Sequence, residues 1–389
     1  MPTLLVLTDS LAPTDGVGQL ARGYLRAWRE LAPALSIDVR LARDAAPEDG
    51  ALGAGVSIRR DLPRVAWSGE RGLLARWFGG AAGARLRPFA FEAPRAILSW
   101  KEHPMTGIAM RWARQLRVPC ASFAHGTYAR RALEEGRTRR AALEEHAAAR
   151  ACFAVSQLVA EKLRAVAEVP HLEVLPNGID LALFGASERG AAPPPCGTAP
   201  FVLTIAPAKE RKGLELALRA WRRFARVEPA WHWVVVGAAF GAEPYGRALA
   251  EALAELPRVH RVERIEEATK RAWLRRARLH LFTPVEAADG AFEGFGLAYL
   301  EAAACGTASI GTTSCGAARH LSSELVSFCA PDEDAIAAEL QRLALRAPAE
   351  RARASARASR AVLAHDLRVG AARVLNVLGL LPAAEVPRR

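Results

Sequence analysis

The stretch that decides the fold covers residues 293–301 and reads Glu-Gly-Phe-Gly-Leu-Ala-Tyr-Leu-Glu. It follows a predicted strand and a loop over residues 283–292, and it runs into the pattern of a helix start. Its two glycines permit a tight loop whose backbone amides can meet a phosphate at that helix start. Seven residues separate Glu293 from Glu301, and a carboxylate at the second position can accept two hydrogen bonds from a diol such as ribose. A core position explains these charges poorly, because buried charges need partners.

Outward from this stretch, short apolar runs alternate with helix-length patterns along the chain. Strands separated by helical patterns indicate βαβ units and a parallel sheet. The predicted strands cover residues 3–8, 36–41, 96–100, 120–124, 151–155 and 171–175 in the first half, and 201–205, 233–237, 279–282 and 308–311 in the second. Ligands of open parallel sheets bind beyond the carboxyl ends of the strands, and the candidate motifs lie there.

Composition divides the chain into two parts. Residues 185–200 are rich in Gly, Ala, Ser and Pro, which is typical of a linker. We therefore predict two α/β domains in tandem, over residues 1–184 and 201–365, with a cleft between them and a mostly helical tail. A length of 389 residues suits two domains, each large enough to bury its own core.

The charge balance is basic, with 53 Lys and Arg against 41 Asp and Glu and a formal net charge of +12. Such a balance can indicate nucleic acid, an anionic membrane surface or an acidic substrate as partner. Only five of the basic residues are lysines, however, and an excess of Arg and Ala is typical of GC-rich coding DNA. No block of consecutive basic residues resembles a nucleic-acid-binding arm. We therefore predict that nucleic acid is not a partner.

The six cysteines are scattered along the chain and include no Cys-x-x-Cys pair. The histidines show no pair at metal-ligand spacing either, so we predict no metal site. Hydrophobic residues make up 51% of the chain and charged residues 24%, which is typical of a globular protein. No apolar run reaches the ~18–20 residues that a membrane span needs. These features predict a protein of a reducing, cytoplasmic compartment.

Two further motifs follow predicted strands in the first half. Gly16 and Gly18 lie between the first strand and the first helix, where they would let a backbone approach an anionic ligand, although a plain turn would give the same pattern. His125 directly follows the strand at 120–124, where it could donate a hydrogen bond or move a proton near neutral pH. A loop histidine with a local hydrogen bond is the alternative reading.

Two more motifs flank the predicted linker. Residues 176–180 read Pro-Asn-Gly-Ile-Asp, a turn in which Asn-Gly suits a positive φ. Arg211 and Lys212 stand between a predicted strand and a helix, where a guanidinium fork and an ammonium charge can clamp a phosphate. A solvated loop is the alternative reading for this basic pair.

These motifs, in this order and spacing, resemble the retaining glycosyltransferases of the GT-B fold, specifically the large family 4 group that uses nucleotide sugars. The Glu-x7-Glu pattern of residues 293–301 carries the resemblance, and residues 15–18, 125–126, 176–180 and 211–213 add to it. The resemblance covers nearly the whole chain. It implies two Rossmann-like domains whose parallel sheets face a central cleft. It also implies that the first domain binds the acceptor, that the second binds the nucleotide sugar, and that residues 366–389 form a helix crossing back to the first.

The resemblance implies roles for the residues of the second domain. Glu301 would hold the ribose hydroxyls and Glu293 the hydroxyls of the donor sugar. The amides of Phe295, Gly296 and Leu297 would contact the sugar or the pyrophosphate. In the same way, the basic pair would neutralise the pyrophosphate as it leaves.

In the first domain, the resemblance implies that Gly16 and Gly18 let the acceptor and the phosphate approach closely. His125 would hydrogen bond to the donor sugar. The family needs no divalent metal or other cofactor, so the basic pair and helix dipoles would carry the charge that a metal carries elsewhere. Because no nucleophile is evident, a covalent intermediate is not expected. The acceptor is expected to attack the anomeric carbon from the same face as the one from which the leaving group departs.

Three departures from the family pattern leave the substrates open. Residues 205–208 read Ile-Ala-Pro-Ala where many relatives carry a Gly-Arg pair. Gly16 stands alone where relatives often have two glycines, and residues 262–265 lack the usual aromatic-Gly end near the base. The sequence therefore specifies neither the nucleotide nor the sugar, the linkage or the acceptor.

The acceptor is expected to be a glycan, a lipid-linked glycan or a small molecule. Residues 71–87 combine Leu, Trp and Phe with four arginines, which suits a basic amphipathic helix on an anionic membrane. Gly79, Gly80 and Gly83 oppose a stable helix there, so a loop or a core-facing helix is the alternative. We predict a bacterial cytoplasmic enzyme of polysaccharide biosynthesis. An amphipathic helix at residues 71–87 would place it peripherally on the inner face of the membrane, and a loop or core-facing helix there would not.

Two other readings share the fold. An inactive scaffold subunit would bind a nucleotide sugar without transferring it, but it would be expected to lose Glu293, Glu301 or the basic pair, and all of these are present. Another GT-B enzyme, such as an epimerase or a phosphorylase, would use the same cleft for different chemistry. An epimerase would be expected to add acidic residues near the anomeric carbon, and no such match is seen.

Overall fold

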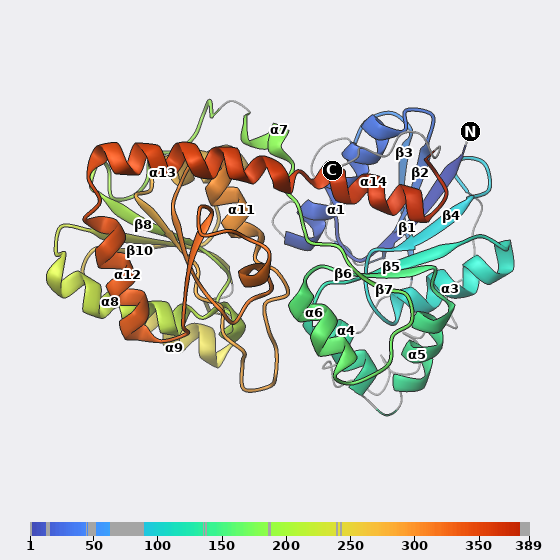
Figure 1. Cartoon of the computed structure of the whole chain (residues 1–389), viewed down its shortest axis with the longest axis horizontal. Helices are drawn as coiled ribbons and strands as arrows, with labels where there is room; N and C mark the ends of the chain where they lie inside the picture. Colours follow the sequence, from blue (N-terminus) through green and yellow to red (C-terminus); the bar gives the residue numbers. More distant parts are fainter. Residues whose placement is uncertain are drawn as a thin grey trace. The chain divides into compact units, whose positions relative to one another are not determined.

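The computed structural model describes residues 2–12, 16–43, 45, 52–62, 89–134, 136, 138–185, 188–238, 240–241 and 243–381. They belong to two compact units, one formed by Met1–Gly178 with Leu367–Arg389 and the other by Ile179–Asp366 (Figure 1). Each unit is built on a parallel sheet, which confirms the α/β prediction.

The sheet of the first unit has the strand order β3-β2-β1-β4-β5-β6-β7. Its strands are β1 (Thr3–Thr8), β2 (Ser36–Ala42), β3 (Val56–Leu62), β4 (Ala96–Ser99), β5 (Cys120–Ala124), β6 (Ala151–Ala154) and β7 (Leu172–Val174). Its described helices are α1 (Gly16–Leu31), α3 (Met105–Leu116), α4 (Thr127–Glu134), α5 (Arg139–Ala148), α6 (Gln157–Arg164) and α14 (Leu367–Val377). The order reverses between β1 and β4, and in doubly wound sheets this switch point is where ligands bind.

The core of the first unit is formed by its apolar strands and by aromatic side chains that pack between α1 and the sheet. Every residue of β1 is buried, as expected for a central strand covered on both faces. Tyr24 of α1 packs edge-on against Trp100, with ring centroids 4.9 Å apart. The indole of Trp28 donates to the carbonyl of Ala371 at 3.1 Å, which fixes α14 on α1.

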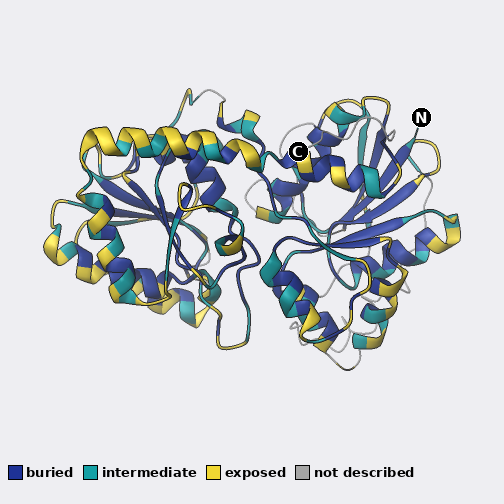
Figure 2. Ribbon diagram, in the orientation of Figure 1, coloured by how far each residue is buried: buried dark blue, intermediate teal, exposed yellow. Residues whose placement is uncertain are grey.

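The sheet of the second unit has the order β10-β9-β8-β11-β12-β13. Its strands are β8 (Phe201–Ile205), β9 (His232–Val236), β10 (Val259–Val262), β11 (Leu279–Leu281), β12 (Ser309–Thr312) and β13 (Val326–Cys329). Its α-helices are α7 (Leu181–Phe184), α8 (Leu214–Val227), α9 (Pro244–Ala254), α10 (Glu267–Arg276), α11 (Leu297–Ala304), α12 (Glu333–Ala344) and α13 (Pro348–Ala361), and its short 3-10 turns are η2 (Glu210–Lys212), η3 (Gly316–Arg319) and η4 (Val362–His365). Figure 2 shows the central strands buried and the outer faces of α8, α12 and α13 exposed.

The segment expected to be a linker, residues 185–200, falls within the second unit. The indole of Trp273 donates to the carbonyl of Ala192 at 2.8 Å, and Arg276 donates to the carbonyl of Gly197 at 3.0 Å. This Pro- and Gly-rich segment forms no helix or strand among its described residues. Side chains of α10 donate hydrogen bonds to its backbone carbonyls, which the partners in a helix or sheet would otherwise do. The boundary between the units lies earlier, at Gly178, inside the predicted Pro-Asn-Gly turn.

The chain passes between the units twice, and the two connecting segments pair with each other. Ile179 and Asp366 form an isolated parallel bridge, and the amide of Ile179 donates to the carbonyl of His365 at 2.8 Å. Helix α14 follows directly and belongs to the first unit. The second unit is therefore inserted into the chain of the first.

Among the described residues, no helix combines the length and the apolar character needed to cross a bilayer. The amphipathic segment at residues 71–87 lies outside the described residues. The expectation of membrane contact through that segment therefore stays a prediction.

Candidate functional site

The site of the second unit is built on two neighbouring strands, β8 and β11. Because both strands run in parallel, the turn η2 after β8 and the loop after β11 meet at the same sheet edge. Gly213 allows the meeting: it has φ +68°, and a Cβ there would lie 1.6 Å from the carbonyl oxygen of Thr283. The hydroxyl of Thr283 donates to the carbonyl of Gly213 at 2.8 Å, and the amide of Val285 donates to the carbonyl of Arg211 at 3.2 Å.

At this junction the predicted basic pair, Arg211 and Lys212, contacts the carboxylate of Glu293. Lys212 Nζ lies 2.7 Å from Glu293 Oε2, and Arg211 Nη1 donates to the same oxygen. Burial raises the pKa of Glu293, but the two cations lower it more, so that the net direction is downward and the carboxylate stays ionised. Two basic groups thus share one carboxylate, and burial lowers the pKa of Lys212, while its ion pair with Glu293 opposes this shift.

The Gly-rich loop that follows Glu293 is fixed by backbone contacts to the segment after β12. The amide of Gly316 donates to the carbonyl of Glu293 at 3.1 Å, and the amide of Ala317 donates to the carbonyl of Phe295 at 3.0 Å. Gly296 has φ +102°, a conformation that L side chains rarely adopt, and a Cβ there would lie 2.9 Å from the ring of Tyr299. The loop therefore needs glycine at this position.

Gly296 is also the N-cap of α11, and as a glycine it supplies no side-chain cap to the helix. The first amides of an α-helix have no partner within the helix, so those at Leu297 and just beyond are available to an anion. The hydroxyl of Tyr299 donates to the carbonyl of Phe282 at 2.6 Å and fixes α11 on the end of β11. The helix start and the basic pair thus lie at the same edge of the second sheet.

Glu301 lies one turn into α11, as the sequence predicts, but its partner is a residue that sequence reasoning missed. Lys270 Nζ of α10 lies 2.9 Å from Glu301 Oε1 and 3.0 Å from Glu267 Oε1. Lys270 and Glu301 are each only 7% exposed. The signal that could have found Lys270 is its rarity, since it is one of five lysines in the chain.

In the first unit, His125 lies at the end of β5, as predicted. Its Nε2 is 2.8 Å from the carbonyl oxygen of Trp100, and its amide donates to Glu102 at 2.9 Å. The ring stacks on Phe123 with an interplanar angle of 11°. Burial lowers the pKa of His125 to about 3, and the nearby Lys101 lowers it as well. The ring is therefore neutral near pH 7, which favours hydrogen bonding over the proton transfer that the sequence left open.

The two predicted glycines lie at the start of α1. Gly16 is the first residue of the helix and is exposed. Gly18 is buried, and a Cβ there would lie 2.7 Å from the carbonyl oxygen of Ala12. The Trp100 indole donates to the carbonyl of Val17 at 3.2 Å, so this helix start lies beside the end of β4 at the switch point of the first sheet.

Ten residues were predicted for the site, and the structure groups them by unit. Arg211, Lys212, Glu293, Phe295, Gly296, Leu297 and Glu301 lie in the second unit, and Gly16, Gly18 and His125 lie in the first. The described residues contain no group of three or more His, Cys, Asp or Glu side chains that could hold a metal ion.

Two family models match the chain. Residues 15–183 match Glycosyltransferase Family 4, and residues 199–345 match Glycosyl transferases group 1. Over 224 residues, the chain is 30% identical to a D-inositol 3-phosphate glycosyltransferase of Segniliparus rotundus. That match covers 52% of this chain and 48% of the relative, so the chain spans about half the length of this curated protein.

Solved structures resemble the chain over nearly its whole length. Anabaena Alr3699/HepE, in complex with UDP and glucose, is 16% identical, with 98% of this chain and 100% of that chain covered and a TM-score of 0.70. An alpha,alpha-trehalose-phosphate synthase (UDP-forming) from Burkholderia vietnamiensis is 16% identical, with 99% and 98% covered and a TM-score of 0.74. This likeness shows the GT-B fold, and with the two family models it shows that the chain belongs to the GT-B glycosyltransferases.

Proposed function

We propose that this protein transfers a sugar from a nucleoside diphosphate sugar to an acceptor hydroxyl, with retention at the anomeric carbon and without a metal ion. The observation that carries the proposal is the convergence of Arg211 and Lys212 on one oxygen of Glu293, beside the uncapped start of α11. A site with two cations and free helix amides is suited to a diphosphate.

The donor is expected to bind along this edge of the second unit. Arg211, Lys212 and the first amides of α11 would hold the diphosphate. Glu293 would accept hydrogen bonds from the sugar hydroxyls, and Glu301 from the ribose. The solved relative from Anabaena holds UDP and glucose, which makes uridine diphosphate the first nucleotide to test.

The reaction breaks the bond between the anomeric carbon and the β-phosphate oxygen, and the electron pair stays on the diphosphate. The acceptor oxygen bonds to the same face of that carbon, and its proton passes to the departing phosphate oxygen. Charge that develops on the leaving group would be stabilised by Arg211, Lys212 and the α11 dipole, the work that a divalent cation can do in other transferases. His125, which is neutral, would hydrogen bond to the donor sugar.

The acceptor remains the open half of the proposal: a glycan, a lipid-linked glycan or a small molecule. The Segniliparus rotundus relative is named for transfer to D-inositol 3-phosphate, so this phosphorylated polyol belongs in the acceptor screen. We place the acceptor with the first unit, beside Gly18 and His125 at the switch point of its sheet.

Ligand-dependent melting tests the donor site. Uridine, guanosine, adenosine and thymidine diphosphates and their common sugar conjugates are added to the wild type and to Glu301→Ala. A ligand at a hundredfold excess over Kd stabilises the folded state by ~2.7 kcal/mol, so binding raises Tm. We expect one nucleotide series to raise Tm in the wild type and not in the variant, with and without EDTA.

A folded wild type whose Tm responds to no nucleotide would contradict the transferase. A donor that binds but is neither transferred to any acceptor nor hydrolysed would favour the inactive scaffold. A Tm response that EDTA abolishes would contradict metal independence alone.

A further inference from the structure

We propose that Lys270 is a positioning residue for nucleotide recognition, because it holds the Glu301 carboxylate through Oε1 and leaves Oε2 for a ribose hydroxyl. This inference rests on the proposed function, which assigns Glu301 to the ribose. Lys270 belongs to α10 and Glu301 to α11, so the contact joins two helices of the second unit. Within the part of the chain that the structure describes, Glu301 has no other side-chain hydrogen bond or ion pair.

The contact is buried on both sides. The side chains of Lys270 and Glu301 are 9% and 10% exposed, whereas the Glu267 side chain that also binds Lys270 is 40% exposed. Burial lowers the pKa of Lys270, but Glu301 and Glu267 raise it more, and the net direction is upward. The ammonium is therefore charged near neutral pH and has two fixed acceptors.

This arrangement gives Lys270 two effects on a bound nucleotide. First, the ion pair with Lys270 already restricts the Glu301 side chain. Glu301 therefore loses less conformational freedom when its second oxygen accepts a hydrogen bond from a ribose hydroxyl. Second, the ammonium compensates the charge of Glu301, so that a buried carboxylate near the diphosphate repels it less. The first effect acts on the ribose form alone, because only that form uses Glu301 Oε2, whereas the second acts on every form of the ligand.

Four variants separate positioning from folding. Lys270→Met removes the ammonium and keeps the apolar stem, and Lys270→Arg keeps a charged donor. Glu267→Gln removes the exposed partner only. Lys162→Met, on α6 of the first unit, is the same substitution far along the chain from the site.

The proteins are titrated calorimetrically with uridine, guanosine and adenosine diphosphates and with their 2′-deoxy and 3′-deoxy counterparts. We expect the wild type to bind one ribose form about tenfold more tightly than a deoxy form, as for a hydrogen bond to a charged group. Lys270→Met should bring that ratio to about one, mainly by weakening the ribose form, and Lys270→Arg should restore it. Lys162→Met and Glu267→Gln should keep the wild-type ratio.

Several outcomes would overturn the inference while leaving the proposed function intact. These are a wild-type ratio in Lys270→Met, an equal loss for ribose and deoxy forms, a Lys270→Arg variant that restores nothing, or a wild type that does not distinguish the two forms. A folded wild type that binds none of the nucleotides would reject the proposed donor site, and the inference with it.

Discussion

At the residue scale, Glu293 forms ion pairs with Arg211 and Lys212, the two basic side chains that the proposed diphosphate would need. Arg211 and Lys212 donate to one and the same oxygen of this carboxylate. An arriving diphosphate would have to compete with Glu293 for both donors, and the released carboxylate could then accept from the sugar. Under the proposed function, diphosphate binding and sugar recognition would thereby be coupled through a single side chain.

This competition makes Glu293→Gln a test with an unusual sign. We expect the variant to bind nucleoside diphosphate more tightly, by up to about tenfold, because a neutral amide holds the two cations less strongly than a carboxylate does. Turnover should fall, because the sugar loses a charged acceptor. Isothermal titration and initial rates give both numbers, and weaker binding of the diphosphate would contradict the coupling.

A second residue-scale prediction concerns acid stability. His280 of β11 is fully buried, and burial lowers its pKa to about 3. Between pH 6.5 and about 3 the unfolded chain binds a proton here that the folded chain does not, so the free energy of unfolding falls as the pH falls. We expect His280→Gln to reduce that slope by ~1.4 kcal/mol per pH unit, measured by urea unfolding between pH 6.5 and 4. An unchanged slope would show that this group does not titrate on unfolding.

Sequence spacing predicted which residues of the second unit belong to the site, but not what they touch. The order of the motifs placed Arg211, Lys212 and Glu293 beyond the ends of strands. Their shared oxygen depends on the close approach of two loops at Gly213, which no local pattern encodes. Lys270 was missed because it is 31 residues from Glu301 in the sequence and lies on another helix.

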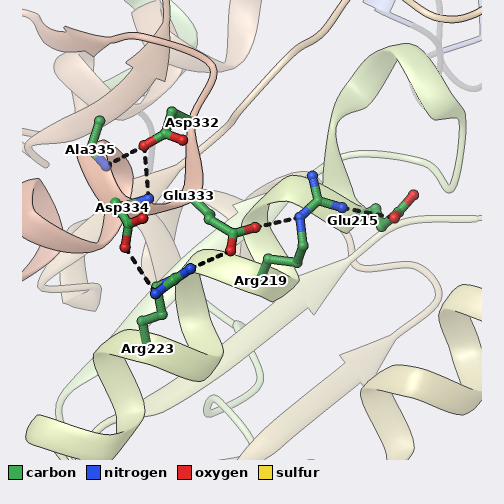
Figure 3. Close-up of polar contacts among 7 residues, drawn as sticks. All are labelled: Glu215, Arg219, Arg223, Asp332, Glu333, Asp334 and Ala335. Carbon is green, nitrogen blue, oxygen red and sulfur yellow. Dashed lines mark hydrogen bonds and ion pairs between the residues drawn. The ribbon is translucent and has the colours of Figure 1, made fainter.

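At the element scale, α8 and α12 are joined by a surface network of charges (Figure 3). Glu333 binds both Arg219 and Arg223, and Arg223 also binds Asp334 at 3.0 Å. Asp332 is the N-cap of α12 and accepts from the amides of Asp334 and Ala335 at 3.0 Å. One acidic run thus caps a helix and attaches it to its neighbour.

These two roles should differ in size. Asp332→Ala should lower the free energy of unfolding by ~1 kcal/mol at any salt concentration, because it leaves helix amides without an acceptor. Glu333→Gln should cost less, and its effect should vanish in high salt, because exposed ion pairs are screened. Denaturant unfolding at two salt concentrations measures both variants, and a Glu333→Gln effect that salt leaves unchanged would contradict this ranking.

The central strands of both sheets could be predicted and three strands could not. The apolar runs of β1, β5 and β8 are fully or almost fully buried, and burial on both faces leaves a continuous apolar run in the sequence. The missed strands are β3, β10 and β13, which lie at sheet edges and are only partly buried. Edge strands carry polar residues, so their sequences resemble loops.

At the scale of the whole molecule, composition was a poor guide to the division of the chain. The Pro-rich composition of residues 185–200 placed the expected boundary there. The chain in fact passes from the first unit to the second after Gly178, and it returns to the first at Leu367. A boundary depends on which contacts cross it, and the side-chain contacts to α10 are invisible in a local pattern. The first unit is made of two stretches of chain and the second of one.

Because the second unit is one continuous stretch of chain, we predict that it folds alone. Residues 179–366 expressed by themselves should unfold cooperatively and bind the same nucleoside diphosphate as the full chain, with a Kd within about tenfold, because the donor residues and both sheet faces belong to this stretch. Circular dichroism and calorimetry measure both. A fragment that unfolds without cooperativity would mean that the second unit needs the first.

The paired connection at Ile179 and His365 has a consequence for synthesis on the ribosome. Chain emerges from the N-terminus, so the inserted unit is complete before α14 exists, while the first unit must wait for that last helix to cover Trp28. During this interval the nascent protein carries a complete second unit and an incomplete first unit, in which the Trp28 indole lacks its acceptor on α14. A stop codon placed just after Asp366 would leave the first half in that state permanently.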